Sequence, residues 1–162
     1  MSNIIRFLTL SLVIVLAACQ GAGRPMTDAE RSVIRDACIT KHAEMLESAL
    51  SVDADGLFSH FADNSEGALA YDGVLHVTRE SALNVVREGF SGLKEQEFEM
   101  VKEYVNVISP EVAVLTGTGT SKGTTKAGET FGGPFVVSIV FVKVGDEWKV
   151  LHMHESLPSV SQ

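Results

Sequence analysis

The chain has few cysteines, few aromatic residues and few basic residues. Of its 162 residues, two are cysteine and one is tryptophan, and 13 lysines and arginines stand against 21 aspartates and glutamates. The resulting charge of −8 repels phosphate backbones, so no nucleic-acid partner is expected. Two cysteines are too few for a disulfide framework. The length suits a single domain that is held together by an apolar core.

The chain also lacks an apolar run long enough for a stable membrane-spanning helix. The longest run covers residues 7–16, whereas a spanning helix takes about 20 apolar residues. Arg6 precedes this run, and small residues leading to Cys19 follow it. A positive residue, a short apolar stretch and a small-residue exit are typical of a secretory signal peptide.

The exit Leu-Ala-Ala-Cys, which ends at Cys19, resembles the lipobox of bacterial lipoproteins. The resemblance implies a signal peptide over residues 1–18, an acylated Cys19 and a tether over 19–26. Two or three acyl chains would anchor the protein firmly on a membrane. Gln20 stands where an inner-membrane retention signal carries Asp, which favours the outer membrane, with the domain facing the periplasm. The alternative is an ordinary signal peptide in which the cysteine has no role.

If Cys19 is acylated, Cys38 is the remaining thiol of the mature chain. No intramolecular disulfide is then available. Cys38 lies on the apolar face of a predicted helix, which favours burial over pairing with another chain.

The first half of the mature chain shows helical periodicity. Thr27 and Glu30 form a capping-box pattern, and apolar residues then recur at helical spacing to about Leu50. Thr78 precedes a third helical stretch, which ends near residues 89–92. The expected elements are helices over 28–50 and from 53 to about 61, short strands over 68–71 and 74–77, and a helix from 79 to about 90.

The second half is rich in Val, Ile, Thr and aromatic residues, which are typical of strands. Short connections between long strands indicate an antiparallel meander. Helices followed by a sheet predict an α+β domain, with the helices packed on one face of a curved sheet. The expected strands cover 98–108, 112–121, 135–144 and 148–156, and a polar, glycine-rich loop covers 122–133.

The last predicted strand is the most informative stretch. Strict alternation would place Trp148, Val150, His152, His154 and Ser156 on one face. The other face would carry Leu151 and Met153. Because both faces hold large apolar groups, we expect a central strand that is covered on both sides. The helices cover one face, so the other predicts a homodimer.

The pattern of Trp148, His152, His154 and Ser156 resembles the last strand of the nuclear transport factor 2-like superfamily. It is especially similar to SnoaL-like domains and to the calcium/calmodulin-dependent protein kinase II association domain. The resemblance spans 27–158 and implies a cone-shaped, cystatin-like α+β fold, usually dimeric. It also implies a pocket between the first and third helices and the sheet. The kinase association domain presents arginines in its pocket strands, but the strands here contain none, so an anion-binding pocket is not expected.

The two histidines of the last strand are candidate pocket residues. His152 and His154 lie ~6.6 Å apart along a strand. A zinc site needs a third protein ligand, and none of the other histidines has ligand spacing to this pair, so we expect no metal and no cofactor. The two histidines are interpreted either as acid/base residues of the pocket or as hydrogen-bonded residues that only shape the pocket.

Other polar residues are weaker candidates. Asp72 lies near the position of the base in ketosteroid-isomerase relatives, but beside Gly73 it is also a common turn former. Tyr71, Tyr104 and His42 can donate to a ligand oxygen or can simply reach water with their polar tips. Trp148 and Ser156 are assigned structural roles.

One strand alternates threonine with glycine. Thr116, Thr118 and Thr120 share a face, which either lines the pocket or meets solvent. Gly117 and Gly119, on the opposite face, are expected to admit close packing by an aromatic ring or a partner subunit.

The sequence contains no nucleophile elbow, phosphate-binding loop or CxxC motif. We therefore expect a lipid-anchored envelope protein that binds a small, mostly apolar molecule or a partner protein without catalysis. One alternative is an enzyme of the SnoaL or ketosteroid-isomerase type, which moves a proton in an apolar cavity. Another is a non-catalytic dimerisation module.

Overall fold

The computed structural model describes residues 24–63 and 66–157. The predicted signal peptide, Cys19 and most of the predicted tether lie outside the described residues. No helix within these ranges is long and apolar enough to cross a membrane. The elements are α1 (Asp28–Leu50), α2 (Ala54–Ser59), β1 (Glu66–Tyr71), β2 (Val74–Thr78), α3 (Arg79–Ser91), β3 (Leu93–Ser109), β4 (Val112–Thr125), β5 (Thr130–Val144) and β6 (Glu147–Ser156).

Helix α1 begins at the predicted capping box. The Glu30 backbone N–H donates to the Thr27 hydroxyl at 3.2 Å, and the Thr27 N–H donates back to the Glu30 carboxylate at 2.8 Å. Hydrogen bonds from Thr27 and Arg24 lower the pKa of Glu30 to about 2. The helix then buries one stripe, which holds Cys38, His42, Met45 and Ala49.

Burial of Cys38 is confirmed. Its side chain has no exposed surface, and burial raises the pKa of the thiol to about 11. Because thiolate is the reactive form, this cysteine acts as a small apolar core residue.

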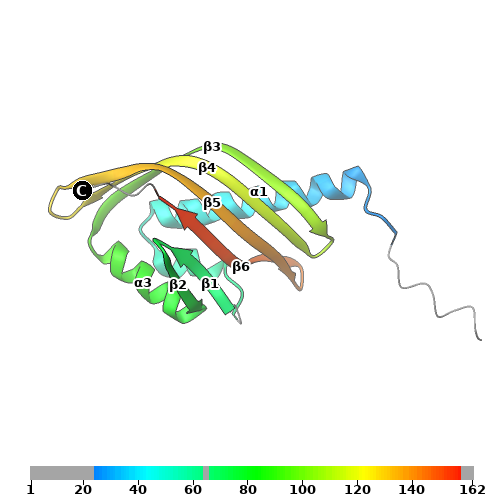
Figure 1. Ribbon diagram of the computed structural model, residues 1–162, viewed down its shortest axis with the longest axis horizontal. Helices are drawn as coiled ribbons and strands as arrows, with labels where there is room; N and C mark the ends of the chain where they lie inside the picture. The colour runs from blue at the N-terminus through cyan, green and yellow to red at the C-terminus, as the bar shows by residue number, and fades with distance from the viewer. Residues whose placement is uncertain (1–23, 64–65, 158–162) are drawn as a thin grey trace, which may run out of the picture.

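The strands form one sheet in the order β2-β1-β6-β5-β4-β3. The predicted meander from β3 to β6 is antiparallel throughout, and β6 pairs in parallel with β1. β6 is therefore a central strand, as expected. Figure 1 shows α1 running along the curved sheet while α3 lies beside β1 and β2. This is the expected α+β arrangement, with helices packed on one face of a curved sheet.

The predicted loop over 122–133 is wrong, because most of it is strand. β4 and β5 continue as a long hairpin in which Ser121 pairs with Gly133 and Gly123 pairs with Phe131. A Cβ on Gly123 would lie 2.4 Å from the Phe131 ring. This glycine therefore makes room for an aromatic side chain within a strand, although the sequence pattern indicated a loop.

The predicted face of β6 is also wrong beyond residue 150. Val140 pairs with His152 and Phe141 pairs with Val150, so Leu151 is an extra residue in β6. Such a bulge reverses the alternation of side chains. Trp148 and Val150 are buried on the inner face as expected. After the bulge, however, the inner face carries Met153 and Glu155, and the outer face carries His152, His154 and Ser156.

The core fills one end of the space between helices and sheet. Its largest fully buried side chains include Met45, Phe58, Leu115, Ile139 and Phe141. All buried core residues of the described chain lie between Cys38 and Val150, and all its helices and strands lie between residues 28 and 156. A fragment of residues 24–162 therefore keeps every helix, strand and buried core residue that the structure describes, and we expect it to fold.

Candidate functional site: an apolar cavity

A cavity of about 790 Å³ opens between α1, α3 and the sheet. This is where the family resemblance placed a pocket, and the volume lies within the range of small-molecule sites, about 300–1,000 Å³. Only the second half of α1 reaches it, through residues 42–49. Tyr71, Phe131 and Leu157 line the cavity and keep exposed surface, so they mark its mouth.

The space exists because the inner face of β4 carries small side chains. The inner-face positions of β4 at this end of the strand are occupied by Gly117, Gly119, Ser121 and Gly123. A Cβ on Gly119 would lie 2.9 Å from the Phe135 ring, so this ring packs directly against the strand as part of the cavity wall. Close packing by an aromatic ring is thus confirmed for Gly119, whereas the prediction is wrong for Gly117, which packs against Met100 of β3.

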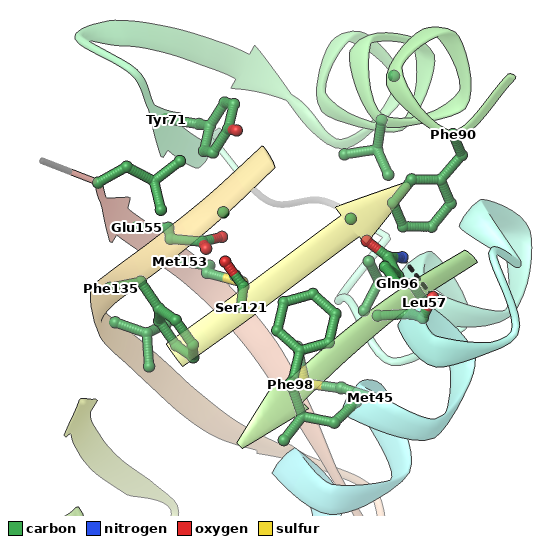
Figure 2. A pocket seen from close by; sticks show the side chains of 18 of the residues that line it. Met45, Leu57, Tyr71, Phe90, Gln96, Phe98, Ser121, Phe135, Met153 and Glu155 are labelled. Atoms are coloured by element: carbon green, nitrogen blue, oxygen red, sulfur yellow. Dashed lines mark hydrogen bonds between the residues drawn. The ribbon is translucent and has the colours of Figure 1, made fainter. Parts of the chain in front are cut away.

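One corner of the cavity is polar. Tyr71 of β1 and Glu155 of β6 are partners in the parallel pairing and both line the cavity. Figure 2 shows the Glu155 carboxyl group pointing into the cavity among apolar side chains. Burial raises the pKa of the Glu155 carboxyl above its ordinary value. Burial, and then the nearby Glu155 and Asp72, raise the pKa of the Tyr71 hydroxyl.

Two polar groups lie on the β3–β4 side. The Gln96 side-chain amide donates to the carbonyl oxygen of Ala49, near the end of α1. No described residue donates to the side-chain oxygen of Gln96, which is directed toward the cavity (Figure 2). Ser121 also directs its hydroxyl into the cavity. Each offers a hydrogen-bonding position to a ligand in otherwise apolar walls.

His42 is a buried polar residue of the cavity wall. Its ring is 3% exposed, and its Nδ1 donates to Oε1 of Glu103 at 2.6 Å. Among the described residues, none forms a hydrogen bond with the other ring nitrogen, Nε2. Every fully buried side-chain nitrogen or oxygen atom of the described chain has a hydrogen-bond partner, so Nε2 is not fully buried. The Nε2 atom therefore keeps some accessible surface, and His42 lines the cavity.

The cavity therefore includes two of the six predicted pocket residues, His42 and Tyr71. Asp72 is exposed at the β1–β2 turn with φ of 48°, which supports its interpretation as a turn former. Tyr104 lies on the outer face of β3, where the Lys102 Nζ is 5.1 Å from its ring centroid. Neither residue lines the cavity.

His152 and His154 were predicted to face the cavity, but the bulge at Leu151 places both on the outer face. The His152 Nδ1 donates to the Gly67 carbonyl oxygen, which ties β6 to β1. His154 is exposed. Of the residues assigned structural roles, Trp148 is buried, whereas Ser156 is exposed on the outer face. The threonines of β4 lie on the outer face as well.

The sequence reasoning missed Glu155, Ser121 and Gln96. Glu155 stands in the strand that was singled out, but its inward direction depends on the bulge. Within the described ranges, no group of three or more His, Cys, Asp or Glu residues lies close enough to hold a metal ion.

The fold and the cavity together define a cone-shaped α+β domain of the nuclear transport factor 2-like class. A SnoaL-like domain profile matches residues 37–160, so the chain belongs to the SnoaL-like domain family. A search of curated proteins found no match.

Solved structures show the same fold at low identity. A nuclear transport factor 2-like protein from Salmonella enterica is 15% identical with a TM-score of 0.72, over 82% of this chain and 96% of that chain. A hexachlorocyclohexane dehydrochlorinase from Novosphingobium barchaimii is 15% identical with a TM-score of 0.68, over 80% and 90%. A protein of unknown function from Shewanella oneidensis is 16% identical with a TM-score of 0.60, over 76% and 99%.

Proposed function

We propose that this protein binds a small, mostly apolar molecule in the cavity between α1, α3 and the sheet. The observation that carries this proposal is a cavity of about 790 Å³ with apolar walls and a few inward-pointing polar groups. An apolar ligand would bury its surface there, and the polar groups would fix its orientation. The name of the similar hexachlorocyclohexane dehydrochlorinase denotes a small apolar substrate, which agrees with this proposal.

Fluorescence titration of residues 24–162 with N-phenyl-1-naphthylamine, a neutral apolar dye, tests the proposal. We expect saturable binding by the parent. Ser121→Leu places an apolar side chain inside the cavity and should weaken binding about tenfold or more. Thr116→Leu places the same leucine side chain on the outer face of the same strand and should leave binding unchanged. Equal weakening by both variants, or no saturable binding by the parent, would contradict the proposal.

Proton transfer is the second candidate function, and the His42–Glu103 pair favours it. With the Nδ1 proton directed at Glu103, a neutral His42 ring carries its lone pair on Nε2. A histidine oriented by a carboxylate is a common general base. In this reaction His42 Nε2 would take a proton from a carbon next to a ligand carbonyl and return it at another position.

Proton abstraction can be tested without the natural substrate. The bicyclic ketone 2-tetralone in D₂O exchanges its α-protons with solvent, which proton NMR follows as loss of signal. We expect the parent to accelerate exchange and His42→Gln to remove the acceleration. Glu99→Gln changes a carboxylate on the outer face and should have no effect. Equal exchange rates for the parent and His42→Gln would exclude this role of His42.

We also propose that the domain is held on the outer membrane by acylated Cys19. Figure 1 shows α1 beginning at the end of the domain opposite the turn between β4 and β5, and the cavity-mouth residue Phe131 lies next to that turn in β5. An anchor upstream of α1 would therefore leave the mouth directed away from the membrane. Cys19→Ser should abolish fatty-acid labelling and cleavage of the precursor. Unchanged labelling and processing would contradict the anchor.

We propose, further, that the outer face of the sheet pairs two copies. The sequence predicted a dimer because Leu151 and Met153 would share the face that the helices leave uncovered. This argument is partly wrong, because Met153 faces the cavity. The outer face instead offers exposed Tyr104, Ile108 and Val136. Sedimentation equilibrium should give a dimer for the parent and a monomer for Val136→Glu, while a monomeric parent would contradict the pairing.

A further inference from the structure

We infer that the cavity selects apolar molecules that carry an ammonium group, which the Glu155 carboxylate and the Tyr71 hydroxyl hold at the β1–β6 corner. This inference rests on the proposed binding function and names the chemical class of the ligand. The natural ligand would then be an apolar amine with one positive charge.

Glu155 has no partner of opposite charge among the residues that the structure describes. None of the ion pairs or hydrogen bonds among the described side chains includes its carboxyl group, which nevertheless points into the cavity (Figure 2). Its neighbour on β5 is the apolar Val137, and its neighbour on β1 is Tyr71. A carboxylate in such walls is poorly solvated, and a ligand cation would supply the missing interaction.

Among the residues that line the cavity there is no arginine, and no lysine side chain points into it. The basic residues among those that line it are His42, whose Nδ1 is paired with Glu103, and Lys122, whose side chain alternation directs to the outer face, beside Glu97. The chain as a whole carries a charge of −8. A carboxylate or phosphate group of a ligand would therefore be repelled by Glu155 at the corner, and no cationic side chain stands there to offset the repulsion. A neutral hydroxyl would form a hydrogen bond but would gain less than an ammonium group.

The selectivity should depend on pH. The titratable groups that face the corner or line the same cavity are Tyr71 on β1, Asp72 at its end, and His42 on α1 with Glu103 on β3. Burial raises the pKa of Glu155, so acidification protonates it before an ordinary glutamate. Amine affinity should therefore fall as the pH drops through this raised pKa, while the affinity for a neutral alcohol stays constant through that step.

The experiment compares decylamine, decanol and decanoate as competitors of N-phenyl-1-naphthylamine on residues 24–162. The three compounds share one chain and differ in the charge of the head group. We expect decylamine to displace the dye at concentrations about tenfold below decanol, and decanoate to be the weakest. Glu155→Gln removes the charge but keeps the shape, so it should bring decylamine to the level of decanol.

Glu99→Gln is the matched control, because it removes one negative charge from the outer face. We expect it to preserve the amine preference. Equal displacement by decylamine and decanol in the parent would overturn the inference. So would an amine preference that survives in Glu155→Gln, because the preference would then come from the overall negative charge. If decanol binds without an amine preference, the proposed binding function stands and this inference fails. If no compound displaces the dye, both fail.

Discussion

The two ends of the inner face of the sheet are built by the same strands and differ in the size of their side chains. At the closed end, β4 presents Ala113 and Leu115, which pack with Ile139 and Phe141 into a fully buried core. At the open end, the same strand presents glycines and Ser121, and a cavity of about 790 Å³ remains. The packed core therefore lies at one end of the cone and the open cavity at the other.

This difference follows from packing physics. A large side chain that is fully buried stabilises the fold through transfer from water and through close contacts. A cavity forgoes these contacts, and a carboxyl group within it adds a cost of desolvation. The open end therefore lowers the stability of the fold, which is the cost expected of the ligand site that we propose there. Substitutions at the two ends should separate these effects.

The largest effect is expected at the closed end. Phe141 has no exposed surface, so Phe141→Ala leaves a hole among rigid neighbours. It should lower the free energy of unfolding by about 3–5 kcal/mol, measured by urea denaturation. Val144→Ala truncates a side chain that is 53% exposed on the same strand and should change stability by less than about 0.5 kcal/mol. Equal effects of the two changes would contradict the assignment of the core to this end.

A smaller effect is expected for an added methyl group in the wall of the cavity. In Gly119→Ala the new Cβ would lie 2.9 Å from the Phe135 ring and 2.5 Å from the Glu99 carbonyl oxygen. The ring and the backbone must shift, which should cost about 1–3 kcal/mol. Gly89→Ala makes the same change in α3, where the added Cβ has no neighbour within 4 Å. It should be neutral or stabilising, by about 0.5–1 kcal/mol. Equal destabilisation by both changes would contradict the close packing of Phe135 on β4.

The smallest effect is a pH-dependent gain of stability in Glu155→Gln. Because burial raises the pKa of Glu155, the folded protein binds its proton more tightly than the unfolded chain does. The parent therefore loses stability as the pH rises from the unfolded-state pKa, about 4.3, through the raised folded-state pKa. Glu155→Gln should melt higher than the parent at pH 7, and the difference should shrink toward pH 4. A variant that melts lower at pH 7 would show that Glu155 stabilises the fold.

Much of the fold could be predicted because its patterns are local. The capping box at Thr27, the helical stripe of α1 and the turn at Asp72 each depend on a few neighbouring residues. The hairpin between β4 and β5 could not be recognised in this way. Its glycines resemble a loop until Phe131 and Phe135, from the next strand, are placed against them.

The site was harder to predict than the fold. A single extra residue at Leu151 exchanges the faces of β6, so the prediction selected His152 and His154 and missed Glu155. No residue type in this stretch marks the bulge, which arises from the pairing of two strands. His42 and Tyr71 could be found from the helical periodicity of α1 and the short predicted strand β1, because neither position depends on the bulge at Leu151.

The most direct test of a ligand cavity at the open end is methyl NMR of residues 24–162 with ¹³C-labelled methionine methyl groups. Met45 and Met153 line the cavity from opposite walls, whereas Met26 precedes α1 and lies outside it. On titration with decanol, the signals of Met45 and Met153 should shift together and saturate, while that of Met26 stays in place. If Met45 and Met153 do not move, or if Met26 shifts as much as they do, the cavity does not bind the ligand and the account is wrong.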